Sequence, residues 1–153
     1  MKKILTTLTI CILASASLLA QEPLRKKHFN LENGLAIQGY DPVAYFTKNK
    51  AVKGKKEFST YYQGSTYYFS SAENKEAFKN NPSKYEPEYG GWCAYAMGAK
   101  GEKVAIDPET FKITNGKLYL FYNKFFNNTL KDWNKDENNL HTKADANWSK
   151  LFH

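Results

Sequence analysis

Residues 111–122 have the sequence FKITNGKLYLFY and carry the strongest fold signal in the chain. The pair Asn115-Gly116 separates two runs rich in β-branched and aromatic residues, Phe111–Thr114 and Lys117–Tyr122. Asn and Gly both tolerate a positive φ, so this pair favours the two-residue turn that joins antiparallel strands. The stretch therefore predicts a β-hairpin.

A second hairpin is predicted upstream of the first. Two β-rich runs, Glu57–Tyr62 and Thr66–Ser70, flank the short Gly-containing connection Gln63–Ser65. Two further extended segments are expected at Leu35–Gln38 and at Lys103–Asp107, where turn-forming residues mark the ends. These segments place most of the predicted strands in antiparallel pairs.

Helix signals lie between the predicted strands. Asp41-Pro42 combines a favoured N-cap with the first residue of a helical turn that continues to Phe46. Ser70 or Ser71 can cap a second helix, and Pro82 ends that helix and starts another turn. Hairpins combined with such helices predict an α+β fold, with the helices packed on one side of the antiparallel hairpins.

The remaining segments are assigned by periodicity. The tail from residue 123 has a helical pattern, whereas Gly98–Lys103 is expected to be a loop. Trp92–Met97 is too short an apolar run to decide between a strand and a tight helical turn. The apolar residues that share one face of the predicted C-terminal helices are Phe126, Leu130, Trp133, Ala144, Trp148 and Leu151.

The N-terminus has the features of a secretion signal. Lys2 and Lys3 precede an apolar run at Ile4–Leu13 and a segment of small residues that ends at Ala20, the preferred cleavage point. The apolar run is shorter than the ~20 residues of a spanning helix, so we expect no transmembrane segment in the mature chain. The predicted organisation is a signal peptide over 1–20, a flexible leader over 21–34 and one domain over 35–153, exported to a bacterial periplasm or secreted.

Charge and composition limit the classes of partner. The chain has 22 Lys and Arg residues against 15 Asp and Glu residues, and the basic residues are scattered. A scattered excess of this size, in a chain expected to be exported, disfavours nucleic acid as a partner. Motifs of phosphate loops, zinc proteases and serine hydrolases are absent from the sequence, which favours a non-catalytic role.

Three motifs in order resemble the exported single-domain proteins of the YHS family. The stretches are GYDPVAYF at 39–46, YFSSAEN at 68–74 and YGGWCAY at 89–95, and the resemblance covers about residues 33–152. The YHS group is similar to the cysteine-bearing TRASH modules, and the resemblance implies metal handling. In those modules a cysteine pair follows the hairpin, and this chain has Ser70 and Asn74 at the matching positions.

Cys93 is the candidate around which a metal site is predicted, since Cys11 lies in the signal. Met97 follows four residues later, and a helix would bring both sulfur atoms to one face. Thiolate and thioether are soft donors that prefer monovalent copper. A third ligand would be a histidine, for which His141 is the candidate, because His28 lies in the leader and His153 ends the chain.

Two alternatives remain open beside a metal-binding module. Cys93 could act as a redox thiolate or nucleophile, although no adjacent positive charge would lower its pKa and no second cysteine lies nearby. The other alternative is a non-catalytic cleft for a small ligand, since Tyr and Trp offer flat apolar surfaces with one hydrogen-bonding group each. The predicted cleft residues are Tyr40, Asp41, Tyr45, Trp92 and Tyr95.

Overall fold

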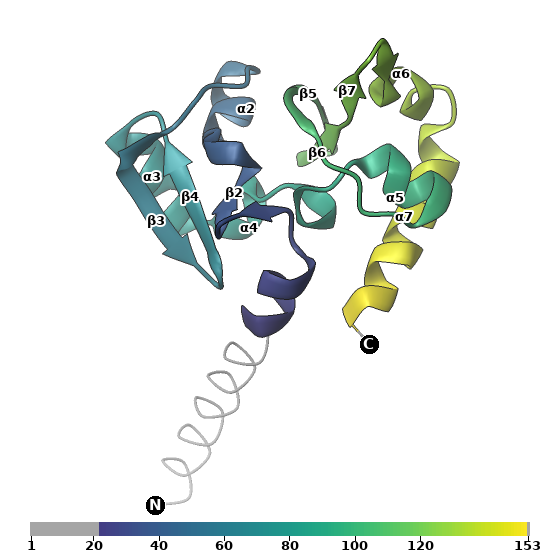
Figure 1. The fold of residues 1–153 in the computed structure, drawn as a ribbon. Helices are drawn as coiled ribbons and strands as arrows, with labels where there is room; N and C mark the ends of the chain where they lie inside the picture. The colour runs from purple at the N-terminus through teal and green to yellow at the C-terminus, as the bar shows by residue number, and fades with distance from the viewer. Residues whose placement is uncertain (1–21, 153) are drawn as a thin grey trace, which may run out of the picture.

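The computed structural model describes residues 22–152 of the chain (Figure 1). The predicted signal peptide, Cys11 and His153 lie outside the described residues. The fold is α+β, as the sequence predicts, and its elements form two halves that lie side by side. The first half contains β1 to β4 with α2, α3 and α4, and the second contains β5 to β8 with α5, α6 and α7.

The first half is built on a four-stranded sheet in the order β1-β2-β4-β3. The predicted hairpin β3–β4 is present, whereas β2 pairs with β4 in parallel, so this sheet is mixed. Helix α3 contacts β3 and β4, and α2 contacts β4 and α3. The bounds are β1 Leu31–Glu32, β2 Leu35–Ala36, η1 Ile37–Gly39, α2 Pro42–Lys48, β3 Lys55–Tyr62, β4 Ser65–Phe69, α3 Ala72–Asn80 and α4 Pro82–Tyr85.

The second half is built around the predicted 111–122 hairpin. Strands β5 and β6 pair on either side of Asn115-Gly116, with Thr114 opposite Lys117. Helices α5 and α7 pack closely, because Gly98 allows the backbone of α5 to approach Leu140, where an added Cβ would lie 2.4 Å from the carbonyl oxygen. The bounds are η2 Glu88–Gly91, α5 Ala94–Lys100, β5 Asp107–Thr114, β6 Lys117–Phe121, β7 Asn123–Lys124, β8 Asn127–Asn128, α6 Thr129–Trp133, α7 Glu137–Ser149 and η3 Lys150–Phe152.

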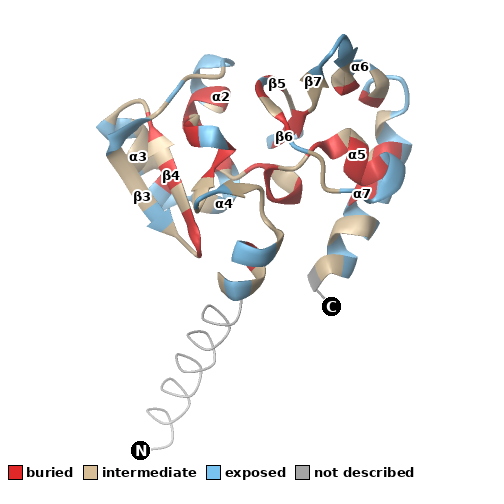
Figure 2. Ribbon diagram, in the orientation of Figure 1, coloured by how far each residue is buried: buried red, intermediate tan, exposed pale blue. Residues whose placement is uncertain are grey.

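Strand β6 separates two hydrophobic clusters. Leu118 and Leu120 belong to the first cluster, whereas Tyr119 and Phe121 belong to the second. Successive side chains of a strand point to opposite faces, so a strand that is apolar throughout can serve both clusters. Figure 2 shows buried segments along β4 and α2 in the first half and along β6 and α5 in the second.

Several local predictions are confirmed by the structure. Asp41 caps α2 by accepting hydrogen bonds from the backbone N–H groups of Val43 and Ala44. Ser71 caps α3 by accepting one from the N–H of Asn74. These caps form as expected because each motif satisfies backbone donors within its own first turn.

Other local predictions are wrong. Residues 102–106 form no strand, and β5 begins at Asp107 instead. Helix α5 continues to Lys100, through the start of the expected loop at Gly98–Lys103. Residues 123–128 form the short hairpin β7–β8 before the helices begin. Phe126 lies in the turn of that hairpin and is fully exposed, so it does not share the buried face of the C-terminal helices.

The segment assigned to the leader packs against both halves. Residues 22–28 are helical, and β1 joins the sheet. The guanidinium of Arg25 forms an ion pair with Glu86 and lies over the ring of Phe29. The ring of Phe29 in turn packs near Trp148 of α7, with centroids 5.9 Å apart. These contacts tie residues 22–34 to the body of the domain.

Candidate functional site

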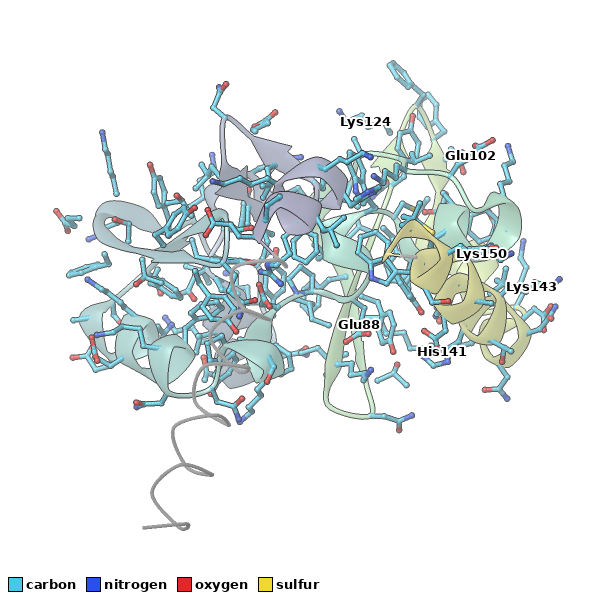
Figure 3. The ribbon with its side chains drawn as sticks, turned by 90° about the horizontal axis from the view of Figure 1, so that it is seen from below. Glu88, Glu102, Lys124, His141, Lys143 and Lys150 are labelled. Atoms are coloured by element: carbon cyan, nitrogen blue, oxygen red, sulfur yellow. The ribbon has the colours of Figure 1, made fainter. Side chains whose placement is uncertain are left out.

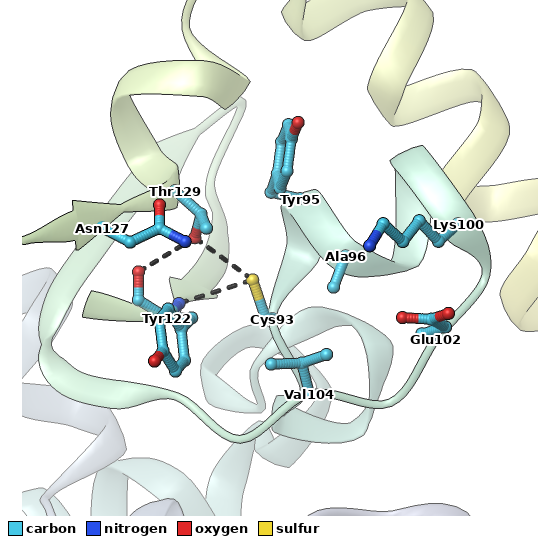
Figure 4. A pocket seen from close by; sticks show the side chains of 9 residues that line it. All are labelled: Cys93, Tyr95, Ala96, Lys100, Glu102, Val104, Tyr122, Asn127 and Thr129. Carbon is cyan, nitrogen blue, oxygen red and sulfur yellow. Dashed lines mark hydrogen bonds between the residues drawn. The ribbon is translucent and has the colours of Figure 1, made fainter. Parts of the chain in front are cut away.

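A pocket of about 360 Å³ opens beside Cys93, where α5, the end of β6 and the start of α6 meet. We call it the thiol pocket (Figure 4). Its wall combines two tyrosine rings with small apolar groups, and a cation and an anion, Lys100 and Glu102, lie together on one side. Its lining residues are Cys93, Tyr95, Ala96, Lys100, Glu102, Val104, Tyr122, Asn127 and Thr129.

Cys93 forms the floor of the thiol pocket and has no exposed surface. Its backbone N–H donates to the carbonyl of Val104, and it makes a parallel bridge to Leu120 of β6. These contacts hold the backbone of Cys93 against Val104 and β6. Cys93 is thus the N-cap of α5, with φ of −59° and ψ of 116°, and lies outside the helix itself.

Two hydrogen-bond partners lie beside the Cys93 Sγ. The hydroxyl of Thr129 donates its single hydrogen to the carbonyl of Tyr122, at 3.0 Å. The 3.3 Å contact between this hydroxyl oxygen and the Cys93 Sγ therefore has the thiol as the donor. The backbone N–H of Tyr122 donates to the Sγ at 3.4 Å. The Sγ therefore has hydrogen-bond partners at the start of α6 and at the residue that follows β6.

Met97 and His141 are not brought to the thiol pocket. Met97 is fully buried in the second hydrophobic cluster, whereas Cys93 belongs to the first. The spacing of four residues predicts a shared face only within a helix, and Cys93 precedes the helical turn. Among residues 22–152, no group of three or more His, Cys, Asp and Glu residues is arranged to hold a metal ion.

His141 belongs to a separate polar cluster on α7. Its Nε2 lies 3.0 Å from the Tyr119 hydroxyl, and its Nδ1 lies 3.6 Å from Asp145, which also accepts a hydrogen bond from Tyr89. Figure 3 shows His141 well apart from Glu102 of the thiol pocket. A smaller pocket of about 100 Å³ adjoins this cluster. His141 is therefore placed to hold α7 against β6.

The residues predicted to form an aromatic cleft make other contacts in the structure. Tyr45 is fully buried and donates its hydroxyl hydrogen to the carbonyl of Pro108, and burial raises its pKa well above the ordinary value. Tyr40 reaches Glu109, and the indole N–H of Trp92 donates to the carbonyl of His28. Of the five predicted residues, only Tyr95 lines the thiol pocket.

Asp41 has a structural environment that the sequence predicts only in part. In addition to its capping bonds, its second carboxylate oxygen accepts hydrogen bonds from the backbone N–H and hydroxyl of Ser70 and from the amide of Asn74. The carboxylate is fully buried. Its oxygens accept from five donors, which belong to α2, to Ser70 directly after β4 and to α3, so the carboxylate joins these elements.

Sequence reasoning missed most of the residues that line the thiol pocket. Tyr122 and Thr129 reach Cys93 from 29 and 36 residues away, through the path of β6, β7 and β8. No local motif marks them. Their role is visible only in the structure, where Thr129 is buried and its hydroxyl needs hydrogen-bond partners.

The comparisons with known proteins are limited to one domain family. Residues 43–89 match the family model of the YHS domain. No curated protein and no solved structure matches the chain. The matched segment runs from α2 into η2 and ends before Cys93, so the thiol pocket lies outside it. In residues 22–152, no helix has the length and apolar character needed to cross a membrane. Residues 43–89 of the chain therefore form a YHS domain.

Proposed function

We propose that the protein is a non-catalytic binding protein and that the thiol pocket holds a small ligand. The observation that carries this proposal is an open pocket of about 360 Å³ whose lining combines apolar, aromatic and charged groups. Ligand sites have this composition, with mostly apolar walls and a few polar groups that orient the ligand. The rings of Tyr95 and Tyr122 suit a flat apolar body, and Lys100 and Glu102 suit a polar or charged end.

The pocket is tested by closing its mouth. Asn127 is an exposed residue of β8 that lines the pocket, and tryptophan at this position would block entry without disturbing the core. A panel of small aromatic acids and amines is screened by ligand-observed NMR. We expect binders whose affinity falls by about tenfold or more in Asn127→Trp, because the lost contacts are worth at least ~1.4 kcal/mol.

The matched control for this screen is Asn138→Trp. Asn138 is also exposed but lines the smaller pocket beside His141. Binding to the thiol pocket leaves this variant with wild-type affinity. The proposal fails if no fragment binds, or if both variants weaken binding equally.

A second candidate function is metal handling, which the family match favours. YHS domains are associated with metal binding, so metal handling fits this family. We propose copper as the metal and Cys93 as the donor, since a thiol is the soft ligand that monovalent copper prefers. Cys93 is itself fully buried, but it lines the floor of an open pocket, so copper would have to enter through this pocket. Met97 and His141 lie elsewhere, so further donors would come from a bound ligand.

Copper binding is tested on protein isolated from its native compartment. The same sample tests the proposed export to the periplasm. If both hold, protein recovered from the periplasmic fraction starts near residue 21 by intact mass and carries about one copper per chain by elemental analysis. Cys93→Ser is expected to lose the copper while keeping both hydrogen bonds to its side chain.

The control for the copper measurement is Met97→Leu. Because Met97 is buried in the second cluster, this volume-conserving change is expected to leave the metal content unchanged. If wild type and Cys93→Ser contain equal amounts of copper, Cys93 does not bind copper. Recovery of the uncut chain from the cytoplasm would remove the export proposal.

A further inference from the structure

Four hairpins in the described residues turn through two residues that both have positive φ. Three of these turns end in glycine, namely Asn33-Gly34, Gln63-Gly64 and Asn115-Gly116. The fourth is Phe125-Phe126, between β7 and β8, with φ of 52° and 65°. Bulky residues rarely adopt positive φ, so this turn holds two phenylalanines against the local preference of the backbone.

Both phenylalanines of this turn, which we call the aromatic tip, are exposed to solvent. Their exposed fractions are 89% for Phe125 and 110% for Phe126. Among the large apolar side chains, Tyr61 has the next highest exposed fraction, 58%, and it lies in the other half of the molecule. The backbone strain and the exposure of the two rings are both unfavourable in the isolated chain. Together they favour a contact of this turn with another molecule or surface.

Two lysines lie near the aromatic tip, although Asp132 of α6 and Glu102 also lie in this part of the molecule. Lys124 directly precedes it (Figure 3), and Lys131 belongs to α6, the helix that lies beside β7 in Figure 1. Both lysines are exposed, and neither belongs to the ion pairs of the described residues. The other residues of the hairpin, Asn123, Asn127 and Asn128, are neutral.

We propose that the aromatic tip inserts into the surface of an anionic lipid bilayer, with Lys124 and Lys131 placed among the headgroups. A two-residue turn is a convex projection, and a fluid bilayer accepts such a shape without a matching cavity. Apolar side chains combined with basic neighbours are the pattern of peripheral membrane contacts, where burial of rings and attraction to anionic lipids add. This site is separate from the ligand proposed for the thiol pocket.

The proposal is tested by sedimentation with lipid vesicles. One set contains equal parts of phosphatidylglycerol and phosphatidylcholine, and the other contains phosphatidylcholine alone. The test variant is Phe125→Asn with Phe126→Gly, which gives the tip the residues that this turn favours. We expect it to bind the anionic vesicles about tenfold or more weaker than wild type, because two rings no longer enter the interface.

The same variant is expected to have a higher Tm than wild type, because the strain of the turn is relieved. A loss of binding together with a gain in stability cannot come from misfolding. Lys124→Gln and Lys131→Gln are each expected to weaken anionic-vesicle binding about fivefold. Tyr61→Asn is the control, since it removes an exposed ring far from the tip. All variants share one N-terminus, so residues 1–21 contribute equally.

Four results would overturn the proposal. The first is equal binding of wild type and the tip variant to anionic vesicles. The second is a difference in binding between wild type and the tip variant that is as large on neutral vesicles as on anionic vesicles. The third is a lower Tm of the tip variant, which contradicts the strain argument. The fourth is a dimer that the tip variant abolishes, measured by light scattering, which would assign the tip to contact between copies of the chain.

Discussion

Raising the pH from 9 to 11 is expected to lower the free energy of unfolding by about 5 kcal/mol. Four buried tyrosines carry this effect, and burial raises the pKa of each above the ordinary value of 10.0: Tyr45, Tyr67, Tyr89 and Tyr119. Nearby carboxylates add to the shifts, as Glu86 does beside Tyr67 and Asp145 beside Tyr89.

The sign follows from which state binds more protons. Above pH 10 the unfolded chain loses its tyrosine protons, whereas the folded chain keeps them. The unfolded state then binds fewer protons, so stability falls as the pH rises. Each tyrosine contributes about 1.4 kcal/mol at pH 11, and a domain with a total stability of ~5–15 kcal/mol comes close to unfolding.

Urea titrations followed by circular dichroism at pH 9 and pH 11 measure this loss, and absorbance of tyrosinate reports ionisation. Tyr45→Phe is the matched variant, because its ring stays in the core while the titrating hydroxyl is removed. Between pH 9 and pH 11, the free energy of unfolding of Tyr45→Phe is expected to fall by about 1.4 kcal/mol less than that of wild type. Reversible ionisation of all tyrosines near pH 10 in the folded protein would contradict the expectation.

The second large effect is expected from Asp41→Ala, which should destabilise the fold by about 3–5 kcal/mol. Alanine removes the acceptor of five hydrogen bonds and leaves their donors buried at the junction of α2, β4 and α3. Unsatisfied buried donors lose their solvation without compensation, which is the main part of the cost. Urea unfolding at neutral pH gives the value.

Ser70→Ala is the control for Asp41→Ala. It removes one hydroxyl donor to the carboxylate and keeps the backbone donor of the same residue. Its expected cost is about 1 kcal/mol, the value of one hydrogen bond. If Asp41→Ala lowers the free energy of unfolding by less than about 1 kcal/mol, the carboxylate does not join the three elements.

The Asp41 cluster also bears on the resemblance to cysteine-bearing modules. The resemblance seen in the sequence implies that Ser70 and Asn74 match the cysteine pair of those modules. In this chain both side chains donate to Asp41, and the cluster is complete without a further group. The same corner of the fold is thus held by a buried carboxylate and its hydrogen bonds.

Local chemistry explains which parts of the fold could be predicted from the sequence. The Asn115-Gly116 hairpin and the caps at Asp41 and Ser71 depend on residues within one turn of each other. The β7–β8 hairpin was missed because Phe125-Phe126 lacks the residues that such a turn favours. A helical pattern of apolar residues was then assigned to a segment whose rings face solvent.

The candidate site shows the limit of local reasoning. The i, i+4 spacing of Cys93 and Met97 indicated a shared face, but α5 begins one residue after Cys93. The residue before a helix has its own backbone angles, which here follow from pairing with Val104 and Leu120. The two sulfur-bearing residues therefore lie in different clusters.

The sequence by itself determined the α+β class, both long hairpins, the helix caps and the resemblance to YHS proteins, because each depends on neighbouring residues. Only the tertiary structure decided that Cys93 is a buried residue on the floor of a pocket, apart from Met97 and His141. The pocket forms where segments 29 to 36 residues apart meet through the packing of β6 and α6. Such contacts arise from the burial of apolar surface by the whole chain, which no short motif encodes.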